Sequence, residues 1–480
     1  SFTRCSNLES IEIPSHVKQI KNHSFFRCLG FSTITFAENS ELESIGECSF
    51  IRTNIRSILV PQHVKRIGSN AFSSCINMVS FECVENSELV TIEKNAFALT
   101  SIKTITIPSS AYDLKTGWMH TMTDLKDIIL LESKEKNLIY YDNKILIGKS
   151  DPKSEIYDII HFFKKDFESI TIPSFIKEIS AYSCSWNDKL KNIEFTENSE
   201  LKIIKDSAFT KALSLESIII PPHVTEISPR AFQGCSNLQR IEFAENSELK
   251  ILGEYSFCSC SILESIKIPK NVTQISNYLF SQAKKLKNVE FDENSKIEII
   301  GQNSFKATAI EYIKIPRHVK EIQSNAFREC VQLKKVEIDE NTELQIIDSH
   351  SFEKSGIKDI SIPSNILEIR NSWCTGTTGL NIHIIKKEKE NIKYYNNNEI
   401  IIGKTNLDSD VFDVILWANK ILESITIPSF IKEIAPNSFE QCIILNEVDF
   451  EENSQLEFID NNAFAGADLT SIEIPSSVKK

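Results

Sequence analysis

Four of the nine histidines share one position, two residues after a proline and directly before a valine: His16, His63, His223 and His318. Imidazole is a common metal ligand and a general acid or base near neutral pH. A metal site needs several ligands at roughly 2 Å from one ion. Residues that recur at intervals of 47 residues or more instead form a row in a repeat protein. We therefore expect these histidines at surface turns and predict no metal site.

Many of the twelve cysteines share one repeat register, three residues after the recurring aromatic residue: Cys28, Cys75, Cys235, Cys260, Cys330 and Cys442. Most recur in every second coil, which separates them by roughly 10 Å if neighbouring coils lie about 4.8 Å apart. That distance is too long for a disulfide, so we expect small buried side chains. Cys258 and Cys260 form a lone Cys-x-Cys pair, which is a weak metal signal.

Other catalytic chemistry has little support in the sequence. No nucleophile elbow, zinc-protease helix, phosphate-binding loop or dinucleotide-binding loop occurs. Carboxylates recur with the repeat and mark no unique pair. We predict that the chain is not an enzyme and takes no cofactor. With 53 basic and 66 acidic residues, a net charge of −13 and no basic cluster, it is a poor nucleic-acid binder. No apolar run approaches the roughly 18 residues that span a bilayer.

A fixed-period repeat positions all of these residues. An apolar residue followed by proline ends a short run at Pro14, Pro61, Pro108, Pro173, Pro221, Pro269, Pro316, Pro363, Pro428 and Pro475. The steps are 47 or 48 residues, apart from two of 65, and a sister unit with Glu-Asn-Ser-Glu-Leu lies between most of them. Apolar residues two apart share one side of a strand, so Ile241 and Phe243 face inward while Arg240 and Glu242 face outward. Proline has no N–H to donate, so it fits a strand end.

One aromatic residue recurs after the turn of each unit. We expect these rings to stack into a continuous buried spine, because each one buries a large apolar area. The predicted spine consists of Phe25, Phe50, Phe72, Phe97, Tyr182, Phe209, Phe232, Phe257, Phe280, Phe305, Phe327, Phe352, Trp373, Phe439 and Phe464.

Residues 215–235 carry the motif Leu-x-x-Ile-x-Ile-Pro-x-x-Val-x-x-Ile-x-x-x-Ala-Phe-x-x-Cys. This motif resembles the BspA-type (treponemal-type) leucine-rich repeats, and the alternation of two unit types is similar to versions in trichomonad surface proteins. The resemblance implies an α/β-type repeat solenoid, mostly β, wound as a right-handed superhelix with a parallel sheet on its concave face. It covers nearly all of residues 1–480, which we expect to form one solenoid.

The two 65-residue steps contain matched insertions, at residues 132–165 and 386–420. Each has two β-rich runs around an Asn-rich turn, which predicts a β-hairpin. Repeat strands are expected before them, with Leu130 in register with Ile107 and Ile385 in register with Ile362. Insertions in repeat proteins often carry function, and tyrosine is favoured at interfaces. Tyr140, Tyr141, Tyr394 and Tyr395 are therefore candidate partner contacts, unless their rings simply pack each hairpin onto the solenoid.

The outward strand positions form the face that a protein partner could use. Glu242, Lys267, Glu290, Lys314 and Glu337 alternate in sign. Opposite charges on neighbouring strands stabilise a sheet by a few tenths to about 1 kcal/mol. The ladder is therefore either self-neutralising or a docking strip, in which Arg240 and Tyr312 are further contact candidates.

Both termini have the sequence of an interrupted repeat, so we expect a fragment whose export signal, membrane anchor or caps lie outside it. Asn22 and Asn271 are glycosylation acceptors if the protein is secreted. The family resemblance implies a non-enzymatic surface adhesin that engages host-cell or extracellular-matrix proteins. The alternative is an intracellular protein-interaction scaffold in the cytoplasm.

Overall fold

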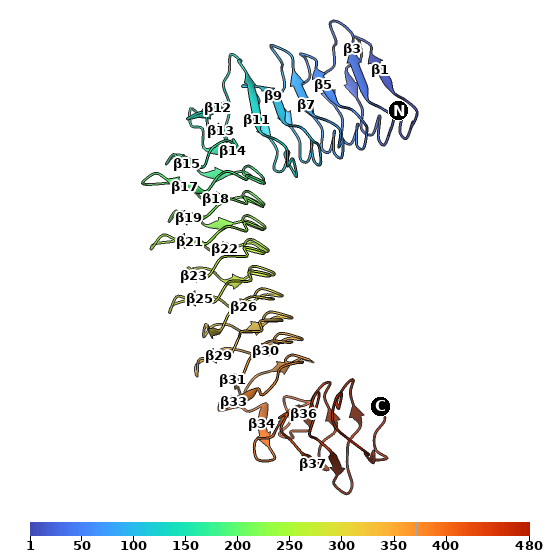
Figure 1. The fold of residues 1–480 in the computed structure, drawn as a ribbon, viewed down its shortest axis with the longest axis vertical. Coiled ribbons are helices and arrows are strands. Elements are labelled where there is room, and N and C mark those ends of the chain that lie inside the picture. Colours follow the sequence, from blue (N-terminus) through green and yellow to red (C-terminus); the bar gives the residue numbers. More distant parts are fainter. Residues whose placement is uncertain (371) are drawn as a thin grey trace. The chain divides into compact units, whose positions relative to one another are not determined.

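The computed structural model describes residues 1–370 and 372–480, and within them every regular element is a strand and none is a helix. The chain divides into two compact units, Ser1–Ser247 and Glu248–Lys480. Each unit is a stack of coils, and a typical coil has a long strand of four or five residues, a short strand of two and a run of turns (Figure 1). The predicted leucine-rich-repeat solenoid is confirmed, with turns where an α/β-type coil would have its helix.

In the first unit, the long strands are β1 (Ser10–Ile13), β3 (Thr33–Phe36), β5 (Ser57–Val60), β7 (Ser80–Cys83), β9 (Thr104–Pro108), β11 (Asp127–Leu131), β15 (Ser169–Ile172), β17 (Asn192–Phe195), β19 (Ser217–Ile220) and β21 (Arg240–Phe243). The short strands are β2 (Gln19–Ile20), β4 (Ser44–Ile45), β6 (Arg66–Ile67), β8 (Thr91–Ile92), β10 (Asp113–Leu114), β16 (Glu178–Ile179), β18 (Ile203–Ile204) and β20 (Glu226–Ile227). Long and short strands form separate parallel sheets.

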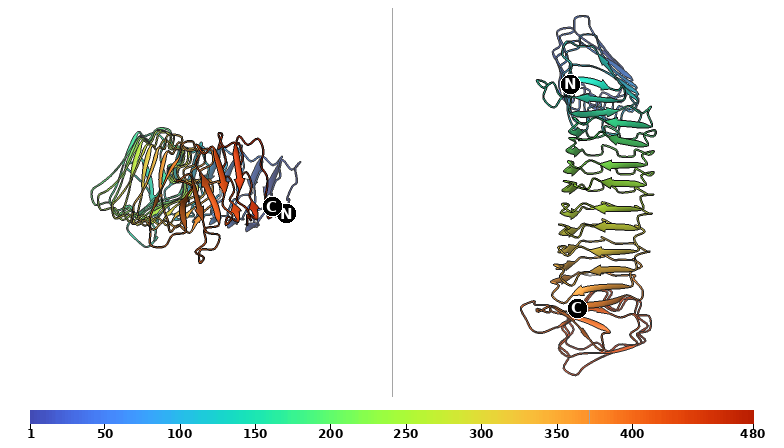
Figure 2. Two further views of the ribbon diagram at one scale, coloured as in Figure 1. Left: turned by 90° about the horizontal axis from the view of Figure 1, so that it is seen from below. Right: turned by 90° about the vertical axis from the view of Figure 1, so that its left-hand side faces the viewer.

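In the second unit, the long strands are β23 (Ser265–Ile268), β25 (Asn288–Phe291), β27 (Tyr312–Ile315), β29 (Lys335–Ile338), β31 (Asp359–Pro363), β33 (Asn381–Ile385), β37 (Ser424–Ile427) and β39 (Glu447–Phe450). The short strands are β22 (Ile251–Leu252), β24 (Gln274–Ile275), β26 (Ile299–Ile300), β28 (Glu321–Ile322), β30 (Ile346–Ile347), β32 (Glu368–Ile369), β38 (Glu433–Ile434) and β40 (Phe458–Ile459). Figure 2 shows the strands of each unit side by side.

Along each stack, neighbouring long strands alternate between pairing over their whole length and pairing at only a few positions. Each strand that precedes a proline pairs over its whole length with the next long strand, as β5 does with β7 and β27 with β29. The next contact is shorter: β7 and β9 share two paired positions, and β29 and β31 share two. The structural module is therefore a pair of coils, which explains the 47-residue period of the sequence. Proline lies after most of these strands, and only β9 and β31 include it as their last residue.

The aromatic spine forms as predicted along most of both units. Phe25, Phe50 and Phe72 stack in sequence, with ring centroids 5.2 and 5.1 Å apart and nearly parallel planes. In the second unit, Phe305 stacks on Phe280 at 5.5 Å and on Phe327 at 5.2 Å. Trp118 and Trp373 end two of these runs with edge-on contacts.

Tyr182 was wrongly assigned to the spine. It is half-buried at φ 62°, two residues before the position that packs inward, and it lies against His120. Cys184 takes the inward position, as its buried side chain and its backbone bond to Ala208 indicate. Phe163 of the inserted strand fills the space that a small cysteine leaves, and its ring lies 5.7 Å from that of Phe209.

The turns hold many residues in the left-handed backbone region. The positions two before and two after the spine aromatic recur there, as with Asn303 (φ 53°) and Ala307 (φ 56°) around Phe305. Asparagine tolerates this conformation and glycine prefers it. Gly234 and Gly466, at φ 71° and 73°, occupy the second of these positions in their own coils.

Both insertions form the predicted hairpins, and each adds a third strand. In the first, β12 (Leu138–Tyr141) pairs antiparallel with β13 (Ile145–Gly148), and β13 with β14 (Ile159–Phe163). In the second, β34 (Ile392–Tyr395), β35 (Ile400–Gly403) and β36 (Val414–Ala418) repeat this order. The third strand then pairs with the next short strand, β16 or β38, so the insertion joins the solenoid.

The strands expected before the insertions also exist. Leu130 pairs with Ile107 as predicted, through β11 and β9. For the second insertion the predicted register is off by one, since Ile384 pairs with Ile362 and Ile385 with Pro363. The prediction uses the same spacing between paired strand positions in both blocks. The second block has one residue fewer than the first between its paired long strands.

Candidate protein-binding surfaces

The outward face of the long strands places the predicted contact residues Tyr312, Lys314 and Glu337 together. The Tyr312 hydroxyl donates to Glu337 Oε2 at 2.7 Å, and Lys314 Nζ lies 3.5 Å from Glu337 Oε1. Burial and the Glu337 carboxylate raise the pKa of Tyr312 to about 12. The same hydrogen bond, with the Lys314 and Lys335 ammonium groups, lowers the pKa of Glu337. These contacts hold the Glu337 carboxylate between a tyrosine hydroxyl and two lysines.

The other predicted ladder residues also lie on this face of their own units. Lys267 and Glu290 are direct cross-strand neighbours on β23 and β25. In the first unit, Arg240 pairs with Glu242 of the same strand, with Nη2 and Oε1 2.6 Å apart. These contacts fit the self-neutralising interpretation, and whether a partner docks here stays a prediction.

Three exposed aliphatic residues at outward strand positions of the first unit were not singled out from the sequence. Leu59 of β5 and Ile219 of β19 are 56% and 59% exposed, and each faces a glutamate on the next strand, Glu82 and Glu242. Ile129 of β11 is 47% exposed at the same register and faces Thr106. Water is an unfavourable environment for such side chains, so an apolar residue at an outward strand position marks a place where contact with a partner is favourable. An apolar residue at an outward strand position was the signal in the sequence that could have identified these residues.

The four candidate tyrosines hold the hairpins onto the solenoid. The Tyr140 hydroxyl donates to the carbonyl of Ile128 on β11 at 2.7 Å, and Tyr394 donates equivalently to Ile382 on β33. Burial raises the pKa of both phenols. Tyr141 and Tyr395 make edge-on contacts with Phe175 and Phe430, with centroids 6.0 Å apart in both cases. Packing accounts for these rings, and Tyr141 is the most open to a partner.

A matched polar latch closes the loop of each insertion, and sequence reasoning missed it. Asp158 accepts hydrogen bonds from the backbone and hydroxyl of Ser150, and Asp413 does the same from Thr405, all at 2.8–2.9 Å. Lys432 Nζ lies 3.3 Å from Asp413. Burial alone would raise the pKa of Asp413, but these hydrogen bonds and the ammonium outweigh it and lower the pKa. The recurrence of Ser/Thr eight residues before Asp was the available signal.

Two of the four predicted histidines and two of the predicted cysteines make contacts within the fold. His63 and His318 lie at the surface and pair with glutamates of the next coil, Glu88 and Glu343, at 2.9 and 2.8 Å. The Cys75 and Cys330 thiols, which are fully buried, donate to the spine carbonyls of Phe50 and Phe305. Burial raises the pKa of both thiols to about 11.

No group of three or more potential metal ligands occurs among the described residues. Across the same residues, no helix has the length and apolarity of a membrane span. The glycosylation acceptors differ in access. Asn22 is exposed, with Oδ1 accepting from the Glu47 backbone, and Asn271 is half-exposed, with Oδ1 accepting from Lys296.

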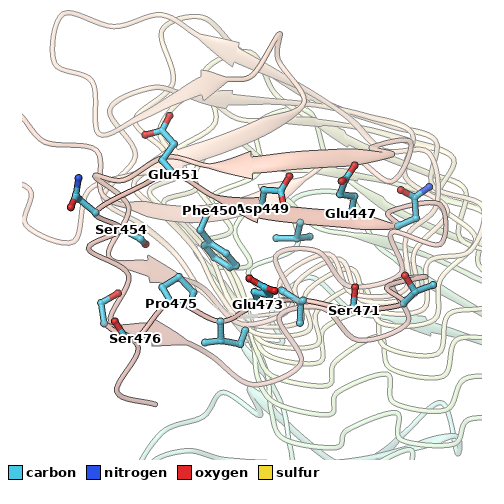
Figure 3. A pocket seen from close by; sticks show the side chains of 16 residues that line it. Glu447, Asp449, Phe450, Glu451, Ser454, Ser471, Glu473, Pro475 and Ser476 are labelled. Carbon is cyan, nitrogen blue, oxygen red and sulfur yellow. The ribbon is translucent and has the colours of Figure 1, made fainter.

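A cavity of about 910 Å³ separates β39 from residues 470–477 in the second unit (Figure 3). Its lining includes the carboxylates of Glu447, Asp449 and Glu473 beside the Phe450 ring. The repeat strand expected to end at Ile474 is not formed. The repeat register would bring Glu473 beside Asp449, and like charges on neighbouring strands oppose pairing.

Comparison with known proteins agrees with this fold. The BspA type leucine rich repeat region matches residues 1–126, 155–287, 250–381 and 415–480, which leaves out the two hairpins. The pneumococcal vaccine antigen PcpA has a similar structure, with a TM-score of 0.52 and 22% identity over 78% of this chain and 79% of PcpA. A leucine-rich repeat protein from Eubacterium ventriosum gives a TM-score of 0.50 and 22% identity over 72% of this chain and 83% of that protein. No curated protein matches. The chain belongs to the BspA-type leucine-rich-repeat family.

Proposed function

We propose that this protein is a non-enzymatic cell-surface adhesin that binds host-cell or extracellular-matrix proteins through the outward face of its long strands. Leucine-rich-repeat proteins generally mediate protein–protein interaction. PcpA, which shares the fold, is a vaccine antigen. The observation that carries the proposal is the exposure of Leu59 and Ile219 on the outward face of the long strands in the first unit, and of Tyr312 on the corresponding face in the second unit.

Such a face suits protein recognition. Its ion pairs, such as Lys314–Glu337, are exposed to solvent, and exposed pairs contribute specificity more than affinity. Its apolar and aromatic side chains supply area that a partner can remove from water. Arg240, Lys267, Glu290 and Lys314 then serve as polar contacts around those anchors.

The experiment is a binding assay of the purified chain on immobilised matrix proteins and on host cells. Ile219→Lys should weaken binding at least tenfold, because it buries a charge at the contact. Leu29→Lys is the matched control, since Leu29 is 62% exposed but lies on a turn before a long strand. Equal binding by wild type and Ile219→Lys, or an equal loss with Leu29→Lys, would contradict the proposed face.

One observation favours the second candidate, an intracellular interaction scaffold. No disulfide joins the cysteines in the part of the chain that the structure describes, and disulfides are rare in reducing compartments. The two candidates share the same binding face and differ in where the protein lies, so localisation of the protein in its own cells separates them.

A further inference from the structure

His161 is the extra residue of a β-bulge in the first insertion. Leu146 of β13 faces Phe162 of β14 while Ile147 faces Ile160, so His161 has no residue opposite it. A bulge redirects the side chain of the extra residue. The imidazole is only 5% exposed and lies against Gly148, where a Cβ would come within 2.6 Å of Nε2.

The buried Nε2 of His161 has no hydrogen-bond partner among the described residues. A neutral ring tolerates this apolar site at a modest cost, whereas an imidazolium would place an unpaired charge there. Burial accordingly lowers the pKa of His161 to about 4.

No carboxylate offsets that burial. The ionisable groups on the elements packed around His161 are Lys144 and Lys149 beside β13, Tyr140 and Tyr141 of β12, Glu178 of β16, and Asp158 and Lys164 at the ends of β14. Asp158 is committed to Ser150 and lies 3.8 Å from Lys177, and Glu178 lies 3.6 Å from Lys205. Protonated His161 would therefore lack a counter-ion in the folded insertion.

The second insertion provides a natural comparison. Its bulge lies at the same place, with Ile401 facing Trp417 and Ile402 facing Ile415, and the extra residue is Leu416. Leu416 lies against Gly403 as His161 lies against Gly148. The latch aspartates match, and burial raises the pKa of both Glu178 and Glu433. The extra residue of the bulge is therefore titratable in the first insertion, where it is His161, and not in the second, where it is Leu416.

We propose that the first insertion is an acid-sensitive switch. Protonation of His161 releases the β12–β13 hairpin from the solenoid, while the β34–β35 hairpin of the second insertion stays docked. Leu138 and Leu146 of this hairpin are buried in the same core cluster as Phe162. Release would expose that apolar surface at low pH and make the region around β11 accessible. This property goes beyond the proposed adhesin function and does not depend on it.

Proton linkage gives the direction and the size of the pH dependence of hairpin release. The released ring titrates near its ordinary pKa of 6.5 and the docked ring near 4. Between these values the released state binds one more proton, so the docked state loses stability as pH falls. The opening equilibrium constant should rise about tenfold for each pH unit.

Hydrogen exchange of the full chain tests this proposal, with the two hairpins compared in the same sample. Backbone protection is measured for residues 138–148 and 392–403 from pH 6.5 to pH 4, each corrected for its intrinsic exchange rate. Protection of the first hairpin should fall relative to the second by about tenfold per pH unit. His161→Leu, which copies the second insertion, should abolish the fall, and Leu416→His should transfer it to the second hairpin.

A ratio that does not change with pH in the wild type would overturn the proposal. So would a fall that persists in His161→Leu, because it would assign the sensitivity to another group. If Leu416→His fails to fold at pH 7, the wild type and His161→Leu decide the question by themselves.

Discussion

At the scale of single residues, repeated positions explain the composition of this chain better than any special site does. The thiols of Cys75, Cys235 and Cys330 donate to spine carbonyls, and threonine takes the same position in some other coils. Thr53 and Cys75 both donate to the carbonyl of Phe50, at 2.9 and 3.0 Å. This carbonyl therefore accepts from a threonine of its own coil and from a cysteine of the next coil.

Replacing Ala307 with glycine should stabilise the protein by about 0.5–1 kcal/mol. Its φ of 56° costs an L-residue roughly 1–2 kcal/mol, which exceeds the extra chain entropy that glycine loses on folding. Urea unfolding measures the change. Gly234→Ala, at φ 71°, is the reverse variant and should destabilise by a similar amount. A destabilised Ala307→Gly would contradict the backbone argument.

Phe305→Ala should cost about 3–5 kcal/mol, since the ring is fully buried between two stacked neighbours. Phe291→Ala is the control, because Phe291 ends β25 half-buried outside the spine. Chemical unfolding of both variants compares them. An equal loss in the two would show that the spine has no special share in cohesion.

At the scale of elements, the strands were predictable and their exceptions were not. Alternation of apolar residues gave the inward positions of β19 and β21, because a strand with one buried face must alternate. Tyr182 was misplaced because the ring that fills its coil comes from Phe163, in an inserted strand. The bulge at His161 and the latch at Asp413 depend on contacts across the insertion, which periodicity does not encode.

The latch of the second insertion gives a pH-dependent prediction. Asp413→Asn should destabilise the β34–β35 hairpin by about 1–2 kcal/mol at pH 7, because it removes charge from two part-buried hydrogen bonds. The lowered pKa of Asp413 means that its contribution is complete above pH 3.8 and is lost as pH falls further. Hydrogen exchange of residues 392–403 measures it. Asp408→Asn, in the same loop but exposed, should have no effect. Equal hydrogen-exchange protection of the hairpin in Asp413→Asn and Asp408→Asn would contradict the stabilising role of Asp413.

At the scale of the whole molecule, the sequence predicted the solenoid, the two-coil period and both hairpins. It did not predict where a partner binds. Tyr140 and Tyr394 have the composition of an interface, but their hydroxyls bond to the backbone of the neighbouring coil. Composition alone cannot separate a tyrosine that packs a hairpin from one that contacts a partner.

The absence of disulfides among the described residues leads to a prediction for the whole chain. A reductant should leave the unfolding midpoint unchanged, because no disulfide joins the cysteines. A thiol reagent should label exposed Cys5 first and half-buried Cys48 more slowly. Buried thiols such as Cys235, whose pKa burial raises to about 12, should react only on unfolding. A midpoint that falls with reductant would contradict this assignment.

The most direct measurement for the proposed function is antibody labelling of intact, unpermeabilised cells that produce this protein. A surface adhesin predicts labelling before permeabilisation, at a level that permeabilisation does not greatly increase. Labelling that occurs only after permeabilisation would contradict the adhesin and favour the intracellular scaffold.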